Sequence, residues 1–217
     1  MKKVSLLGFT LLSVLLFVGC GNSDNNTNND AVDGKSVSNT NKSVNSKEVD
    51  SNLLINHNEF KMIADNGPNE DVKVIEQKDY NISWSDNSWS GLNYSADKVS
   101  ILKLDGYKDY SDNEYEGFVL VHFNIDNTER DISTYPEQAT LVTNTGEQTE
   151  GDYSLGNWAG DIMQGVKKDG YSAYPLKKLT DINEISSLRL KINSSYDTDD
   201  FNDTNAYHDY DITIELK

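Results

Sequence analysis

The chain has 217 residues and carries 36 acidic against 19 basic residues, which gives a formal net charge of −17 at pH 7. Such acidity disfavours nucleic acid and anionic lipid as binding partners. The only arginines are Arg130 and Arg189, so no guanidinium cluster is available to hold phosphate groups. The single cysteine, Cys20, excludes an intramolecular disulfide, and the folded part must therefore depend on its hydrophobic core.

The first residues have the pattern of a secretory signal, residues 1–19. Two lysines precede an apolar run from Val4 to Phe17, and this run is shorter than the roughly twenty residues that span a bilayer as a helix. The stretch Phe17-Val18-Gly19 before Cys20 resembles the lipobox of bacterial lipoproteins, although Leu is commonest where Phe17 stands. The resemblance implies cleavage after Gly19 and a diacylglycerol on the thiol of Cys20. Two acyl chains would hold the protein stably at the outer face of the cytoplasmic membrane; an ordinary signal with an incidental cysteine is the alternative.

Residues 20–51 are expected to form a disordered tether behind the anchor. The segment is rich in Asn, Ser and Asp, has no aromatic residue and almost no aliphatic one. It therefore has too little apolar surface to offset the entropy cost of ordering the chain. We expect a flexible leash that separates the folded domain from the membrane.

Residues 52–79 form a lead-in segment of mixed character. The stretch "NHNEFKMIADNG" places Phe60, Ile63 and Ala64 at helical spacing, with Gly67 as a stop. A strand that leads into the following domain is the alternative.

Hydrophobic periodicity is mostly two over residues 80–217. The stretch "EGFVLVHFNID" places Val119, Val121, Phe123 and Ile125 on one face, and apolar residues on both faces for half its length indicate a central strand. The stretch "HDYDITIELK" alternates cleanly between apolar and polar residues. Further strands are expected at "SSLRLKINS", "KVSILKL", "ATLVT" and "GYSAYPL". The stretch "TNTGEQ" predicts a hairpin turn at Gly146. Seven or so short strands predict an all-β, antiparallel immunoglobulin-like β-sandwich.

From about Trp89 to Leu216 the sequence resembles a family of Gram-positive surface lipoproteins of unknown function. The resemblance rests on "SWSGLNYSADKVSILKL", "EGFVLVHFNIDNTERDIS", "YPEQATLVTNTGEQ" and "GYSAYPL" before the final "HDYDITIEL". The domain of that family is a telokin-like, immunoglobulin-type sandwich similar to mycobacterial immunoprotective secreted antigens. The resemblance therefore implies a fold and an extracellular location, and no activity.

No constellation of residues points to catalysis. Ser154 in "GDYSLG" has the wrong spacing for a nucleophile elbow. The three histidines, His57, His122 and His208, share no metal-ligand spacing. Carboxylates are so frequent that pairs of them carry little information about acid–base chemistry. We expect no enzyme and no cofactor besides the lipid, with a carboxylate-based cell-wall hydrolase as the less favoured alternative.

Two groups of residues are candidate sites. The loop "SYDTDDFNDTN" holds Asp197, Asp199, Asp200 and Asp203, which either help to bind calcium or form a solvated loop, because the Gly and terminal Glu of an EF-hand are missing. Trp158, in the glycine-bearing loop "LGNWAGD", is the candidate exposed aromatic contact, together with Tyr153 and Tyr171, whereas Trp89 is expected in the core.

These observations favour a cell-surface lipoprotein whose β-sandwich binds an envelope protein or a cell-wall ligand without catalysis. A calcium-responsive or structural component of the envelope is the alternative.

Overall fold

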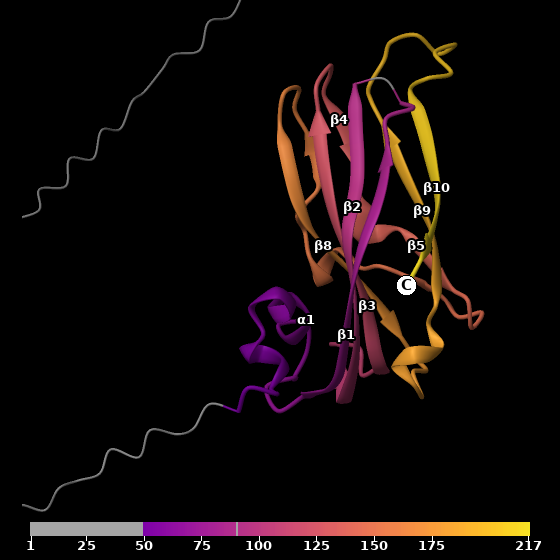
Figure 1. Ribbon diagram of the computed structural model, residues 1–217. Coiled ribbons are helices and arrows are strands. Elements are labelled where there is room, and N and C mark those ends of the chain that lie inside the picture. The colour runs from indigo at the N-terminus through magenta and orange to yellow at the C-terminus, as the bar shows by residue number, and fades with distance from the viewer. Residues whose placement is uncertain (1–49, 90) are drawn as a thin grey trace, which may run out of the picture. The chain divides into compact units, whose positions relative to one another are not determined.

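The computed structural model describes residues 50–89 and 91–217, which lie within one compact unit, Lys47–Lys217 (Figure 1). The predicted signal, Cys20 and nearly all of the predicted tether lie outside the described residues. Antiparallel strands dominate the unit and form two facing sheets, so the prediction of an antiparallel β-sandwich is confirmed. Within the described ranges, no helix is long and apolar enough to cross a membrane.

The first sheet has the strand order β1-β2-β3-β8, with every pair antiparallel. Its members are β1 (Lys73–Asp86), β2 (Leu92–Lys108), β3 (Glu114–Asn127) and β8 (Lys167–Leu176). As predicted from its two apolar faces, β3 lies between two neighbours.

The second sheet is built around β9 (Ser187–Ser195). The last strand, β10 (Tyr207–Glu215), pairs along one edge of β9 in continuous register. The other edge is shared by two short strands, because β5 pairs with residues 188–191 and β4 with residues 194–195. The short strands are β4 (Ile132–Thr134), β5 (Thr140–Thr143), β6 (Gln148–Glu150), which pairs with β5, and β7 (Gly160–Ile162), which pairs with β4.

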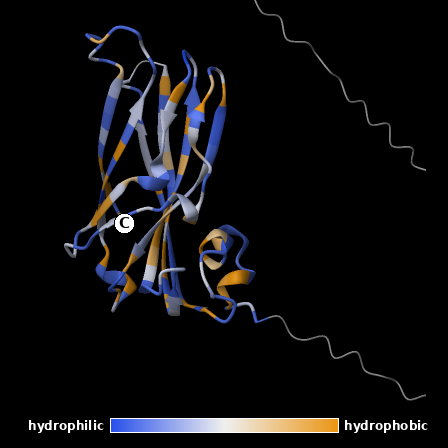
Figure 2. Ribbon diagram, turned by 180° about the vertical axis from the view of Figure 1, so that it is seen from behind, coloured by the Kyte–Doolittle hydropathy of each residue, from blue (hydrophilic) through white to orange (hydrophobic). Residues whose placement is uncertain are grey.

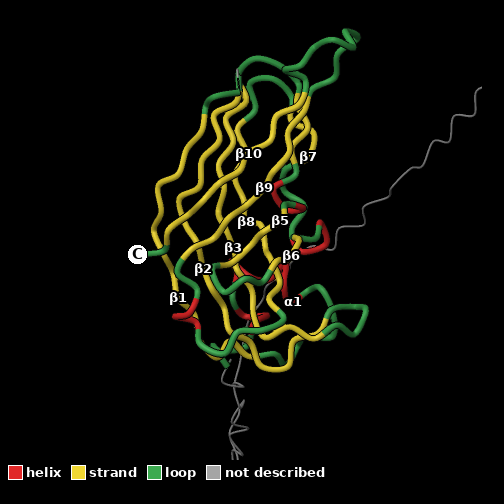
Figure 3. The backbone as a smooth tube through the Cα atoms, turned by 90° about the vertical axis from the view of Figure 1, so that its right-hand side faces the viewer, coloured by secondary structure: helices red, strands yellow, loops and turns green. Residues whose placement is uncertain are grey.

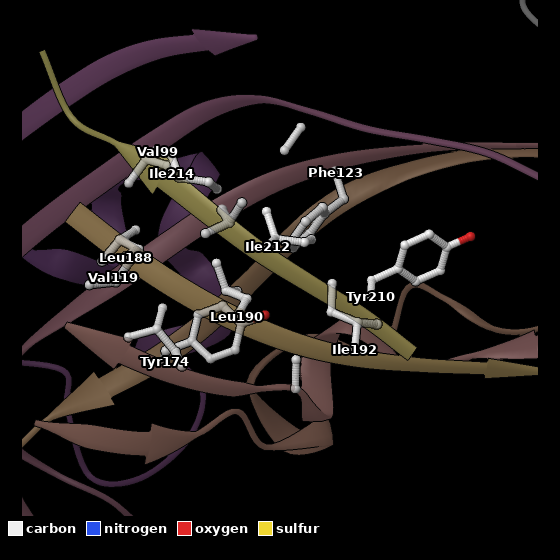
Figure 4. Close-up of a cluster of buried hydrophobic side chains, with 14 of the residues drawn as sticks. Val99, Val119, Phe123, Tyr174, Leu188, Leu190, Ile192, Tyr210, Ile212 and Ile214 are labelled. Carbon is white, nitrogen blue, oxygen red and sulfur yellow. The ribbon is translucent and has the colours of Figure 1, made fainter. Parts of the chain in front are cut away.

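Alternating side chains of the two sheets meet in the main core (Figure 4). Val119 and Phe123 of β3 point from the first sheet toward Leu190 of β9 and Ile212 of β10 in the second. These side chains are almost completely buried, which is the main source of stability for a domain that has no disulfide. Trp89 also belongs to this core, as predicted.

The lead-in forms a second core on the outer face of the first sheet. It folds into two 3₁₀ turns, η1 (Leu54–Asn56) and η2 (Asn58–Phe60), and the short helix α1 (Lys61–Ala64), whose hydrophobic residues are visible in Figure 2. Their buried side chains join Leu102, Phe118 and Leu120 of the sheet. The second apolar face of β3 therefore lies under the lead-in, and the regular strand begins at Lys73, seven residues before the predicted domain start at residue 80.

The long strands run between two groups of loops (Figure 3). We call one group the loop end: the connections β1–β2, β3–β4 (residues 128–131), β7–β8 (residues 163–166) and β9–β10 (residues 196–206). The lead-in meets β1 at the opposite end of this strand, where Leu53 bridges to Lys73. The strand β1 has 14 residues, so this entry point lies about 40 Å from the loop end.

Candidate binding surface at the loop end

Asn127, at the end of β3, ties two connections of the loop end together. Its side-chain amide donates hydrogen bonds to the carbonyl oxygens of Arg130 (2.7 Å), Ile162 (3.0 Å) and Met163 (3.0 Å). Its backbone exchanges hydrogen bonds with the β7–β8 connection, where Gly165 N–H donates to the Asn127 carbonyl at 2.7 Å. Because Asn127 is completely buried, these bonds are shielded from water and fix the β3–β4 and β7–β8 connections relative to each other.

The β9–β10 loop is anchored on Trp89. The indole Nε1 of Trp89 donates to the carbonyl oxygen of Asn205 at 2.8 Å. At the base of the loop, Tyr196 N–H donates to the Ala206 carbonyl at 3.0 Å, and the Tyr196 hydroxyl donates to Asp203 Oδ2 at 2.9 Å. The loop is therefore attached at its base to a tryptophan of the main core.

Four side chains stack in one column below this loop. The Trp89 ring stacks with His208 (5.9 Å between centroids, 10° between planes) and with Tyr196 (5.7 Å, 21°). The Arg130 guanidinium lies 4.4 Å from the centroid of the Tyr196 ring, which is the geometry of a cation–π contact. The column joins residues from β10, the β1–β2 connection, the β9–β10 loop and the β3–β4 connection, so it holds these segments of the loop end together.

Large apolar side chains project into solvent from this ordered frame. Phe201, in the middle of the β9–β10 loop, is fully exposed, with 103% relative exposure. Tyr207 at the start of β10 is 80% exposed and Met163 is 69% exposed. Three large exposed side chains therefore lie at the loop end: one in the β9–β10 loop, one at the start of β10 and one in the β7–β8 connection.

A hollow of about 650 Å³ lies beside the β9–β10 loop, between the β3–β4 and β7–β8 connections. The acidic residues of its lining are Glu129, Asp131, Asp161 and Asp197, and Arg130 is the basic residue. Asp161 accepts hydrogen bonds from the hydroxyl groups of Ser133 (2.7 Å) and Tyr135 (3.2 Å). Desolvation and the neighbouring Asp161 carboxylate raise the pKa of Tyr135, which favours the neutral phenol that donates this bond. The hollow therefore has a negative electrostatic character.

The four candidate calcium ligands lie in the β9–β10 loop. Two of them serve the loop itself: Asp200 Oδ1 accepts from Asn202 N–H at 2.9 Å, and Asp203 Oδ1 accepts from Asn205 N–H at 3.0 Å. Asp197 and Asp199 are exposed. Among the described residues, no group of three or more His, Cys, Asp or Glu side chains is arranged to hold a metal ion. The structure thus does not bring the four aspartates together as a ligand set.

The three candidate aromatic contacts do not share one surface. Trp158 is half-buried against the main core, lies over Gly170 where that residue has no Cβ, and donates to Ser172 Oγ at 3.2 Å. Tyr171 points from the opposite face of β8 and packs against His122 (4.7 Å between ring centroids). Tyr153 is exposed on a 3₁₀ turn, η4 (Tyr153–Leu155). The expectation that Trp158 is exposed is met only in part, because Gly170 leaves room for the half-buried indole to pack on β8.

A polar network that sequence reasoning did not identify surrounds His122 on the outer face of the first sheet. His122 Nδ1 lies 2.7 Å from Asp97 Oδ1, and Nε2 lies 3.4 Å from Asp169 Oδ2. Asn124 Nδ2 also donates to Asp97 at 3.0 Å. Desolvation raises the pKa of Asp97, but the hydrogen bonds with His122 and Asn124 lower this pKa by more, so the carboxylate stays ionised. These contacts link side chains of three strands, β2, β3 and β8, and join His122 to no hydroxyl or thiol nucleophile among the described residues.

The sequence matches no protein-family model and no curated protein. Among solved structures, the chain is similar to a functionally unknown protein from Listeria monocytogenes EGD-e, with a TM-score of 0.47 and 11% identity over 72% of this chain and 93% of that chain. It is also similar to a conserved hypothetical protein from Bacillus anthracis, with a TM-score of 0.38 and 12% identity over 54% of this chain and 92% of that chain.

Proposed function

We propose that this chain is a lipid-anchored surface protein whose immunoglobulin-like β-sandwich acts as a non-enzymatic binding module, with the loop end as its contact surface. The observation that carries the proposal is the anchored β9–β10 loop, which holds Phe201 fully exposed. Exposed aromatic side chains on ordered loops are the typical anchor residues of binding surfaces. Loops gathered at one end of a sandwich are also the elements that immunoglobulin-like domains use for recognition.

The placement of the lead-in supports an orientation for this module. The resemblance of residues 17–20 to a lipobox implies an anchor before the lead-in. The lead-in is fixed at the opposite end of β1 from the loop end, where Asp50 and Lys73 form an ion pair of 3.3 Å. An anchored chain would therefore enter the domain about 40 Å from the loop end and leave the loop end free to face away from the membrane.

The loop end offers shape, apolar contacts and negative charge, which are the properties of a recognition surface. The partner would be another component of the cell envelope.

The proposal is tested on intact cells with the full-length protein. A photoreactive benzoylphenylalanine is placed at Tyr207 or Met163 of the loop end, and at Tyr110 as a control. Tyr110 is 76% exposed in the β2–β3 turn, at the other end of the first sheet. We expect the same cross-linked partner from both loop-end positions and none from Tyr110.

Equal products from all three positions, or no product from the loop end, would contradict the binding surface. The anchor is tested separately with Cys20→Ala, which should abolish lipid attachment and leave the protein unprocessed or released. A Cys20→Ala protein that still carries lipid would show that the lipobox assignment is wrong.

A further inference from the structure

We infer that Phe201 is an anchor residue that enters an apolar pocket of a partner protein, and that basic residues surround this pocket. The inference rests on the proposed binding function and specifies the chemistry of the partner.

The first reason is that the β9–β10 loop presents Phe201 in an ordered form. Inside the loop, Asp203 N–H donates to the Asp200 carbonyl at 3.0 Å, and Asn202 N–H donates to Asp200 Oδ1 at 2.9 Å. The loop is also attached to Trp89 through Asn205. Because the residues on both sides of Phe201 are already fixed, binding costs little further loop entropy. This is the arrangement expected of an anchor side chain that inserts without rearrangement.

The second reason is the difference between Phe201 and two other exposed aromatic residues, Tyr110 and Tyr135. Tyr110 uses its hydroxyl to donate to the Asp65 carbonyl at 3.0 Å, and Tyr135 donates to Asp161. These tyrosines have a polar group that binds the protein surface. Phe201 has no polar group and projects entirely into water, so an apolar pocket is the complement that removes its ring from solvent.

The third reason is the negative charge around Phe201, which indicates the chemistry of the partner surface. Asp199 and Asp200 directly precede Phe201, Asp203 follows two residues later, and Asp197 continues into the acidic hollow. No described residue donates a hydrogen bond to the carboxylate of Asp197 or Asp199. Burying these charges against a neutral or acidic surface would cost free energy, whereas basic side chains around the pocket would compensate them.

The same charges argue against other occupants. A second copy of this chain would bring another net-negative surface to the loop, and like charges in contact repel. An anionic membrane surface would repel the aspartates that flank Phe201, so insertion of the ring into lipid is disfavoured. A protein pocket with a basic rim is the occupant that fits both the ring and its surroundings.

The test uses the full-length protein in the cells that make it, with benzoylphenylalanine in place of Phe201. We expect one protein product, attached through a segment that carries apolar residues and a net positive charge. The double variant Asp197→Lys with Asp199→Lys is then introduced. Neither carboxylate takes part in the hydrogen bonds of the loop, so the fold should persist while the cross-linking yield falls about ten-fold or more.

The matched control reverses two exposed acids of the lead-in, Glu70→Lys with Asp71→Lys, and should leave the yield unchanged. A product attached through a neutral or acidic segment, a lipid product, or an equal loss of yield in both double variants would overturn the inference. If position 201 gives no product while Tyr207 and Met163 still capture a partner, the inference fails and the binding function stands. If none of the three captures a partner, both fail.

Discussion

Replacing Phe60 with alanine tests whether the lead-in and the sandwich are one folding unit. Phe60 is 1% exposed and belongs to the second core with Leu102, Phe118 and Leu120. Removing a fully buried phenylalanine ring costs about 3–5 kcal/mol, which combines lost transfer energy with the cavity left behind. This is a large part of the total stability of about 5–15 kcal/mol that is usual for a domain.

The assay is urea unfolding of residues 47–217 followed by tryptophan fluorescence. All three tryptophans, Trp84, Trp89 and Trp158, pack on the main core and none on the second core. Their signal therefore shifts only if the two cores unfold together. We expect Phe60→Ala to move the midpoint to lower urea with an unchanged slope.

The control is Asn58→Ala in the same 3₁₀ turn, where the side chain is exposed. Its effect should stay within about 0.5 kcal/mol. If the fluorescence midpoint of Phe60→Ala equals that of the unchanged protein, the lead-in unfolds on its own and the reasoning from the second core is wrong.

Two further predictions concern titration and metal binding. Glu137 is buried, neither of its carboxyl oxygens has a hydrogen-bond partner among the described residues, and burial raises its pKa. The folded state then holds this proton more tightly than the unfolded state, so the free energy of unfolding should fall as pH rises above the ordinary glutamate value of about 4.5. Glu137→Gln should remove this fall in the free energy of unfolding and be more stable than the unchanged protein at pH 8, as measured by urea unfolding. An equal pH dependence of stability in both proteins would contradict this prediction. Calcium at millimolar concentration should leave Tm unchanged, because Asp200 and Asp203 already accept hydrogen bonds from the loop; a rise in Tm that a chelator reverses would instead support a calcium site.

The strands that the sequence predicted are those with one consistently buried face. In β10 and β9, apolar residues alternate with exposed polar residues along the whole strand, and a period of two is then easy to read. In β1 this signal is confined to the second half, where Tyr80, Ile82 and Trp84 alternate with polar residues. The first half is mostly exposed, and the strand lies at the edge of the sheet with two register shifts against β2. The strands β4, β6 and β7 have three residues each, which is too short for any period.

The loop end was only partly predictable for a different reason. The sequence marked the β9–β10 loop by its aspartates, yet the feature that distinguishes it in space is Phe201, a single apolar residue in a polar run. A single exposed apolar side chain produces no hydrophobic periodicity in the sequence, so its exposure cannot be predicted from the pattern. Trp158 shows the opposite case: its glycine-bearing loop suggests exposure, but Gly170 on β8 provides the space in which the indole is half-buried.

The strand β3 connects the second core under the lead-in, the main core and the loop end. Leu120 points into the second core under the lead-in, Val121 points into the main core, and Asn127 at the end of the strand binds the connections that form the loop end. A substitution under the lead-in therefore acts on stability through the same strand that ends at the loop end. Asn127 itself is held by hydrogen bonds inside the loop end, at the other end of β3 from Phe118. As long as the unit remains folded, the loop end should therefore keep its geometry when residues under the lead-in are changed.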